Sequence, residues 1–344
     1  MSTHYDALIV MGFGGPTSMD QVEPFLKHIT GGRITAERMA KVSEHYAHFG
    51  GVSPLNGQNQ KLANDVAARL RDKGIDVPVY LTHAHVAPFP EQTLAQIVAD
   101  GHERALVLVP AAYSSYVGCR SYREALAAAT PVDDEGRPRL EIAKINPFYD
   151  MPAFVDAQIG LLEPVVRAHP DAKLLFTTHS LPTGLSETSG VGGDGYLKQH
   201  HRVIDQILAG LANKGLRPDW QLCYTSQGGA PGDTWLTPDV NDVIDELATQ
   251  GVKEVIAVSI GFLSDHMEVI WDLDNEAAQT ARGHGMGFYR VPTVANEPVF
   301  LDGLAELVAR GLAGEDRRGD DDCGGEDCCP NPGGAVPAVR GVTP

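Results

Sequence analysis

The sequence has no apolar run that approaches the ~20 residues of a membrane-spanning helix. Its first residues, MSTHYDALIV, carry no basic segment ahead of the apolar ones, so we expect no signal peptide and a cytoplasmic protein. Basic residues are few, with 27 Lys and Arg against 45 Asp and Glu and a formal net charge of −18. Such a chain repels nucleic acid and anionic lipid, so we expect neither as a partner.

Common nucleotide and hydrolase motifs are also missing. The sequence contains no Walker motif and no G-x-S-x-G. The glycine-rich stretch GFGGP at residues 12–16 lacks the G-x-G-x-x-G spacing of dinucleotide sites. We therefore predict a tight turn there and no nucleotide.

Cysteine is scarce and unevenly placed. Cys119 and Cys223 stand alone, whereas Cys323, Cys328 and Cys329 crowd a Gly-, Pro- and Asp-rich C-terminal segment. Without a secretion signal, disulfides are the weaker explanation, and metal or redox chemistry is favoured.

The 344 residues, 43% of them hydrophobic, are enough for two domains. Short apolar runs alternate with amphipathic segments, which indicates an α/β fold with parallel sheets buried on both faces. We expect two Rossmann-like domains facing a central cleft. The domains are residues 1–150 and 151–314, with the last helix packing back on the first domain, and 315–344 form a Cys-rich tail. The predicted strands are residues 5–13, 77–83, 104–110, 140–145, 172–179, 221–226, 254–262 and 287–292.

The stretch SDHMEVIWDLDNE at residues 264–276 is rich in acids although it follows a buried strand. On a regular helix Asp265, Glu268, Asp272 and Glu276 fall within a stripe roughly 80° wide. A solvated face, with a capping arrangement at its start, is the simpler interpretation. The alternative is a site, because ligands of open α/β sheets bind at the carboxyl ends of strands.

A histidine occupies the same kind of position on another strand. His179 ends the apolar run 172–179, just before Pro182. A histidine there is more often a hydrogen-bonded structural residue. Facing Glu268 across one sheet edge, however, it could bind a divalent metal or accept protons.

Two further polar segments are residues 45–62 and 111–126. The simpler interpretation is that they are ordinary loops. Alternatively, they line a site for a large aromatic ligand that carries carboxylates.

Four of these segments together resemble the ferrochelatases, which insert ferrous iron into a porphyrin. The order and spacing match from residue 5 to about 313. The resemblance implies the chelatase fold, in which His179 and Glu268 face each other over the porphyrin as catalytic residues and ligands of the iron substrate. Asp272 and Glu276 would extend this line as metal ligands or a proton path. The matching segments are MGFGGP (11–16), FGGVSPLN (49–56), THSLP (178–182) and SIGFLSDHMEVIWDLD (259–274).

The resemblance also implies contacts with the porphyrin. Ser53 and Tyr122 would touch the macrocycle. Phe13 takes the place of a tyrosine that ligates the product iron in some Gram-positive members, so tyrosine ligation is not expected here. Further contacts, to propionates, are implied for Arg33, His45 and Tyr46.

The closest likeness is to the actinobacterial branch, which implies Fe(II) and coproporphyrin III as substrates and a transient contact with the next enzyme of haem synthesis. Basic groups near Arg33, His45 and Arg120 would meet the four propionates. Alternatives are a protoporphyrin IX ferrochelatase, a cobalt chelatase, and a non-catalytic haem or metal carrier on the same fold.

Actinobacterial ferrochelatases also hold a 2Fe–2S cluster through tail cysteines and one upstream cysteine. The resemblance therefore implies a cluster on Cys119, Cys323, Cys328 and Cys329. Two other interpretations remain: a structural zinc site with the same four thiolates, and a disordered tail with free thiols. Cys223 lies in an apolar run, where it is typical of a small buried hydrophobic residue.

Overall fold

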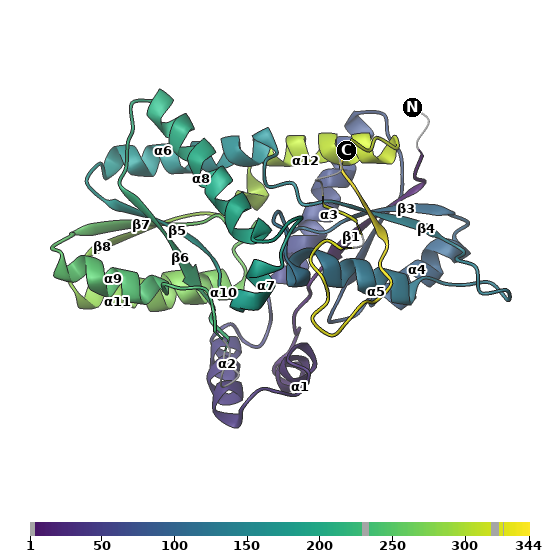
Figure 1. The fold of residues 1–344 in the computed structure, drawn as a ribbon, viewed down its shortest axis with the longest axis horizontal. Helices are drawn as coiled ribbons and strands as arrows, with labels where there is room; N and C mark the ends of the chain where they lie inside the picture. Colours follow the sequence, from purple (N-terminus) through teal and green to yellow (C-terminus); the bar gives the residue numbers. More distant parts are fainter. Residues whose placement is uncertain (1–3, 229–233, 318–322, 326) are drawn as a thin grey trace. The chain divides into compact units, whose positions relative to one another are not determined.

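The computed structural model describes residues 4–228, 234–317, 323–325 and 327–344. It forms two compact α/β units, each built around a parallel sheet (Figure 1). The C-terminal segment, predicted to be a separate tail, is grouped with the first unit. That unit comprises Met1–Phe148, Thr188–Tyr196 and Leu301–Pro344, and the second comprises Tyr149–Glu187 and Leu197–Phe300.

The sheet of the first unit is parallel throughout. Every residue of β1 is buried, as its continuous apolar sequence predicts. The edge strand β9 was not predicted, and it adds to β4 from the C-terminal segment. In spatial order the strands are β2 (Val79–His83), β1 (Ala7–Gly12), β3 (Arg104–Leu108), β4 (Glu141–Ile145) and β9 (Arg340–Val342).

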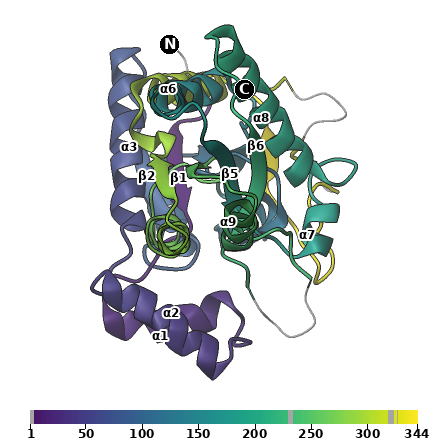
Figure 2. The same ribbon diagram turned by 90° about the vertical axis from the view of Figure 1, so that its left-hand side faces the viewer.

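Helices cover both faces of this sheet, with α4 and α5 on one face (Figure 1) and α3, which lies along β1 and β2, on the other (Figures 1 and 2). One core joins strand residues such as Ile9 to Leu94 of α4 and Leu126 of α5. Helices α3 and α12 are linked by ion pairs, including Arg69 Nε to Asp302 Oδ1 at 2.7 Å. The helices are α1 (Met19–Ile29), α2 (Ala36–His48), α3 (Leu55–Asp72), α4 (Pro90–Ala99), the π-helix η1 (Tyr116–Arg120), α5 (Ser121–Ala129) and α12 (Pro298–Leu312).

Two local expectations for this unit are not met by the structure. The predicted tight turn after β1 is not confirmed, because residues 13–16 form no hydrogen-bonded turn; Gly14 nevertheless has φ +83°, and an added Cβ would lie 2.5 Å from Val86. The polar-loop interpretation of residues 111–126 is wrong for most of the segment. It forms η1 and α5, and the Ser115 hydroxyl begins η1 by accepting a hydrogen bond from the Gly118 N–H at 2.8 Å.

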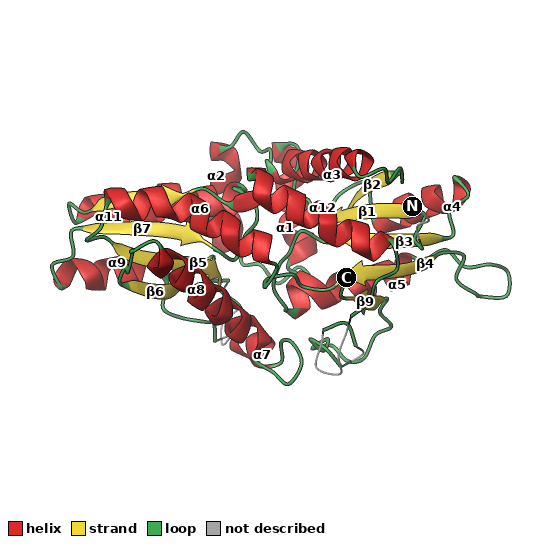
Figure 3. Ribbon diagram, turned by 90° about the horizontal axis from the view of Figure 1, so that it is seen from above, coloured by secondary structure: helices red, strands yellow, loops and turns green. Residues whose placement is uncertain are grey.

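The second unit has the same layered organisation, with α6 and α8 on one face and α9 and α11 on the other (Figures 1 and 3). Its parallel sheet has the order β6 (Trp220–Thr225), β5 (Lys173–His179), β7 (Glu254–Ser259) and β8 (Gly287–Val291). The helices are α6 (Pro152–Ala168), α7 (Thr183–Glu187), α8 (Gly195–Asn213), α9 (Val240–Thr249), α10 (Met267–Val269), the π-helix η2 (Ile270–Ala277), α11 (Ala278–Gly283) and the short η3 (Val294–Asn296). The predicted α/β class with parallel sheets is confirmed. Within the described residues, no helix combines the length and apolarity that a bilayer crossing requires.

Candidate active site

His179 and Glu268 meet at one edge of the second sheet. His179 is the last residue of β5, and Glu268 lies in α10, shortly after the neighbouring strand β7. The two strands are parallel, so their carboxyl ends share an edge. His179 Nε2 lies 3.9 Å from Glu268 Oε2, and the two side chains are 34% and 50% exposed. Both groups are therefore accessible to a ligand.

The backbone carbonyl of Ser180 fixes the orientation of the His179 imidazole. Nδ1 of His179 donates to the carbonyl oxygen of Ser180, so in the neutral ring the lone pair is on Nε2, the atom facing Glu268. Ser180 is held in turn by its N–H to the Thr225 carbonyl and by its hydroxyl to the Leu236 carbonyl, both at 2.8 Å. The sequence HSLP thus positions a proton acceptor.

Glycine is required where the two strand ends come together. A Cβ on Gly261 would lie 2.0 Å from the Thr178 hydroxyl oxygen, so a side chain there would push β7 and β5 apart. The next residue, Phe262, has its ring centroid 6.0 Å from that of His179 and packs edge-on against His266 at 4.5 Å. Burial lowers the pKa of His266; the charge of Glu268 opposes this shift, and repulsion from His179 adds to it. His266 is therefore a neutral neighbour of the pair.

Asp265 does not belong to the acidic stripe, contrary to the sequence-based expectation. It precedes the helix and pairs with Arg290 of β8, with Nη1 to Oδ1 at 2.7 Å. Arg290 also contacts Asp274. The capping interpretation is wrong too, because the N-cap of α10 is His266 and its side chain makes no capping bond. Asp265 and Arg290 instead anchor the start of the acidic segment to the sheet.

Contrary to the sequence-based prediction, the acidic segment is not one regular α-helix. Ile270–Ala277 is a π-helix, in which hydrogen bonds run from i to i+5. Trp271 Nε1 donates to Glu276 Oε1 at 2.9 Å, a contact between side chains five residues apart. π-Helical turns are frequent at functional sites, where they re-aim side chains.

Asp272 lies within this π-helix and accepts a hydrogen bond from the hydroxyl of Ser226. Burial raises the pKa of Asp272 to about 7; the Ser226 bond opposes the shift, and the charges of Glu268 and Glu276 increase it. Asp272 is therefore a carboxyl group that exchanges protons near neutral pH. Ser226 has φ +59°, a left-handed conformation rare outside glycine, directly after β6. The sequence analysis did not identify Ser226 as a site residue, although a polar residue directly after a buried strand was a possible signal.

The porphyrin-contact candidates lie in the first unit and differ in accessibility. Phe13 is 37% exposed and packs against His85, with centroids 4.3 Å apart. Ser53 is nearly buried against Gly15, where an added Cβ would lie 2.5 Å from the serine Cβ. The others range from exposed Arg33 and half-buried His45 to buried Tyr46 and Tyr122.

Arg120 does not serve as a propionate partner, which corrects the expectation. Its side chain is 7% exposed and its Nε donates to Glu124 Oε1 at 2.9 Å. It also donates to the Val336 carbonyl at 3.1 Å. Arg120 is thus a buried ion-pair residue that holds the C-terminal segment against α5.

The four predicted cluster cysteines gather in the first unit. Hydrogen bonding with Cys323 and Cys329 lowers the pKa of the Cys328 thiol and raises the pKa values of the other two thiols. The sulfurs of Cys328 and Cys329 are 3.8 Å apart. Cys329 has φ +52°, so a left-handed backbone accompanies this close approach of adjacent thiols. Cys119 is within electrostatic reach of both Cys323 and Cys329.

The groups around these sulfurs are hydrogen-bond donors. The Gly190 N–H donates to Cys329 Sγ at 3.1 Å, and Lys144 Nζ donates to Cys119 Sγ at 3.4 Å. The Ser114 hydroxyl contacts Cys323 Sγ at 3.0 Å. Among the described residues, no three His, Cys, Asp or Glu side chains stand in the geometry of a bound metal. Cys223 is fully buried in β6, which confirms its interpretation as a small core residue.

Comparison with known proteins identifies the family. The family model described as Ferrochelatase matches residues 5–312. The chain belongs to the ferrochelatase family. The coproporphyrin III ferrochelatase of Propionibacterium freudenreichii subsp. freudenreichii is 51% identical over 334 residues, covering 96% of this chain and 95% of the relative. That of Streptomyces coelicolor is 40% identical over 326 residues, covering 91% and 87%.

A solved structure shares the ferrochelatase chain's fold. SirB from Bacillus subtilis with Fe3+ superposes with a TM-score of 0.53 at 12% identity, covering 92% of this chain and 98% of SirB. At this identity the likeness shows the fold alone.

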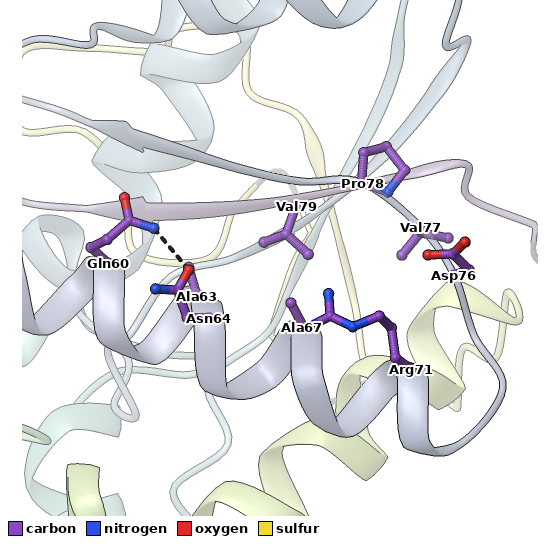
Figure 4. Close-up of a pocket in the computed structure, with 9 residues that line it drawn as sticks. All are labelled: Gln60, Ala63, Asn64, Ala67, Arg71, Asp76, Val77, Pro78 and Val79. Carbon is purple, nitrogen blue, oxygen red and sulfur yellow. Dashed lines mark hydrogen bonds between the residues drawn. The ribbon is translucent and has the colours of Figure 1, made fainter.

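The first unit carries a surface pocket. It has a volume of about 480 Å³ and is formed by α3 and β2 of the first unit (Figure 4). Its wall includes Arg71, Val79, and Gln60, which donates to Asn64 at 3.1 Å. None of the residues implied in porphyrin or iron binding lines it.

Proposed function

We propose that this protein inserts ferrous iron into coproporphyrin III, forming iron coproporphyrin for haem synthesis. The observation that carries the proposal is the pair formed by His179 Nε2 and Glu268 Oε2, 3.9 Å apart at the carboxyl edge of a parallel sheet. The names of relatives that match most of the chain support the choice of porphyrin.

Metal insertion requires two pyrrole N–H protons to leave as iron sheds its water. His179 is suited to accept one of them, because its Nδ1 is held by Ser180 and the lone pair is on Nε2. Glu268, 50% exposed, offers carboxylate oxygens that ligate Fe(II) or accept the second proton. The pair thus combines a base with a hard oxygen ligand.

Protons or iron need a route to or from the pair. Asp272 interacts electrostatically with Glu268 and with Glu276, which supports a shared role of the three carboxyl groups in such a route. A group with a pKa of about 7 accepts and releases protons with equal ease at neutral pH. We infer that Asp272 relays protons from the metallation site.

We further propose that residues of the first unit bind the porphyrin. Ser53 and Tyr122 contact the macrocycle, and Phe13 offers an exposed apolar ring. Arg33 and His45 bind propionates, since charge-assisted hydrogen bonds to carboxylates are the strong ones. Tyr46, packed edge-on against Phe25, belongs to the same group of proposed contacts.

An anaerobic assay tests the proposed reaction. Fe(II) is mixed with coproporphyrin III or protoporphyrin IX, and metallation is followed by visible absorption, with enzyme-free samples as controls. We expect many equivalents of product per protein and faster turnover with coproporphyrin III. Stoichiometric binding without turnover would indicate a carrier, and a preference for protoporphyrin IX or for Co(II) would contradict the assigned substrates.

We also propose that Cys119, Cys323, Cys328 and Cys329 hold a 2Fe–2S cluster. The proposal is supported by the sulfurs of Cys328 and Cys329, which lie 3.8 Å apart, and by donors such as the Gly190 N–H to Cys329, an environment that suits thiolates. When bound, such a cluster carries one electron reversibly. Through Cys119, the cluster would then tie the C-terminal segment to η1 of the first unit.

The cofactor proposal has its own test. Protein purified anaerobically should contain iron and acid-labile sulfide in equal amounts and absorb in the visible. Zinc in place of iron, with no colour, would establish the rival structural site. Free thiols without any metal would reject both.

Finally, we infer that the protein acts in the cytoplasm and passes its product to the next enzyme of haem synthesis by a transient contact. The supporting observations are the acidic net charge and the lack of a bilayer-crossing helix among the described residues. A fractionation experiment that recovered the protein with membranes would contradict this inference.

A further inference from the structure

Two cations are almost completely buried near the cysteines. Lys144 of β4 is 1% exposed and Arg123 of α5 is 2% exposed. Lys144 Nζ donates to the Ile145 carbonyl at 2.8 Å and to Cys119 Sγ at 3.4 Å. Within the described residues, the Arg123 guanidinium donates only to backbone carbonyls of the C-terminal segment, those of Gly324, Gly325 and Val339 at 2.6 to 3.0 Å.

Neither cation forms an ion pair with a carboxylate anywhere in the described parts of the chain. Their neighbour Arg120 provides a contrast, because it is equally buried but paired with Glu124. A buried charge without a counter-ion is strongly destabilising, so the counter-ions of Lys144 and Arg123 should be sought among other groups that become anionic.

The cysteine sulfurs meet this requirement. Lys144 touches Cys119 directly, and Arg123 interacts electrostatically with Cys119, Cys328 and Cys329. Thiolates that ligate a metal are deprotonated and anionic. The two buried cations therefore flank a site that becomes negative when it is loaded.

We propose that Lys144 and Arg123 are the charge partners of the thiolate site and raise the reduction potential of the cluster bound there. The inference rests on the proposed 2Fe–2S cluster. Reduction by an external one-electron donor adds one negative charge to the cluster and leaves its four thiolate bonds in place. Buried positive charges beside the sulfurs favour the more negative, reduced form. Lys144 and Arg123 act through the cluster and touch no porphyrin.

Three substitutions of Lys144 in the full chain separate charge from packing. Lys144→Met removes the charge and keeps the length, Lys144→Gln keeps a donor for the Ile145 carbonyl, and Lys144→Arg keeps the charge. Lys73→Met serves as a control, because Lys73 is a half-exposed lysine of the same unit paired with Glu306. The midpoint potential is measured anaerobically with dithionite as reductant, by the electron paramagnetic resonance signal of the reduced cluster.

We expect Lys144→Met and Lys144→Gln to lower the reduced-to-oxidised ratio about tenfold at a fixed potential, a shift of about 59 mV to more negative values. Lys144→Arg and the control should stay near the parent. Arg123→Met should shift the potential in the same direction, and Arg123→Lys should restore most of it.

Other outcomes of these measurements would support or overturn the proposed role of Lys144 and Arg123. An unchanged potential in Lys144→Met, with full iron and sulfide, would overturn the inference and leave the cluster standing. A parent protein without iron and sulfide would remove the cluster and this inference together. If the neutral variants lose the cluster while Lys144→Arg keeps it, the charge-partner role is supported. If all three lose it, Lys144 is a packing residue and the inference is wrong.

Discussion

The Nε2 atom of His179 lies 3.9 Å from Oε2 of Glu268, although the two residues are far apart in the sequence. The parallel pairing of β5 with β7 brings them together. A base and a carboxylate at this separation leave room for a small metal ion to contact both after a slight movement of either side chain.

Glu268→Gln should reduce the rate of iron insertion by about 100-fold or more, because it removes a charged ligand and proton acceptor but keeps the shape. The melting temperature should stay near that of the parent, since the Glu268 side chain is half exposed and caps no helix. Rate and thermal melt are measured on the same preparation. A large loss of melting temperature with a normal rate would assign Glu268 a structural role.

Asp272→Asn should stabilise the metal-free protein at neutral and alkaline pH. The folded pKa of Asp272 is raised from 3.8 to about 7, so the folded state binds its proton more tightly than the unfolded state does. The stability that the bound proton of Asp272 contributes to the parent therefore falls as pH rises from about 4 to about 7, and this contribution is absent above that range. The asparagine variant should lack this loss.

Thermal melts of both proteins between pH 5 and pH 8 test the point. The advantage of Asp272→Asn should grow with pH and then level off above pH 7. Asp274→Asn is the matched control on the same helix: it removes a partner of Arg290 and should lower the melting temperature. A constant difference between Asp272→Asn and the parent at every pH would contradict the raised pKa.

Arg33→Met should raise the KM for coproporphyrin III about tenfold and change kcat little, since one charge-assisted hydrogen bond to a substrate carboxylate contributes ~1.5–3 kcal/mol. Arg137→Met, a substitution at another exposed arginine paired with Asp133, should leave both constants unchanged. Equal effects of the two substitutions would show that Arg33 acts only through net charge.

Cys119→Ser should lose most of the cluster iron and sulfide and lower the melting temperature, because a ligand that joins the C-terminal segment to the first unit is gone. Cys223→Ser places a hydroxyl in the core of β6, so it should reduce stability but keep the cluster. A Cys119→Ser protein with its full content of iron and sulfide would exclude Cys119 as the fourth ligand.

The sequence predicted the strands well because their burial on both faces leaves an unmistakable apolar run, as in residues 7–12. It did not predict β9, whose three residues carry no such run. That strand depends on pairing with β4 and on the Val339 carbonyl being held by Arg123, contacts that join residues about 200 positions apart.

The site was harder to predict where it depends on tertiary contacts. The stripe of acids was visible, but the π-helical turn that holds Glu276 against Trp271 has no local sequence signature. The Ser226–Asp272 bond joins two segments 46 residues apart. In the sequence, Lys144 is a single basic residue within an apolar run. Its proposed role depends on a contact with Cys119 of another element, which the sequence does not reveal.

The most direct test of the account is iron insertion by His179→Ala. Removing a general base from its position lowers the rate by about 10²–10⁴-fold. We predict a loss in this range for Fe(II) insertion into coproporphyrin III, with porphyrin binding, followed by fluorescence quenching in the same samples, close to that of the parent. Near-normal turnover in His179→Ala would contradict the central role of His179 and Glu268.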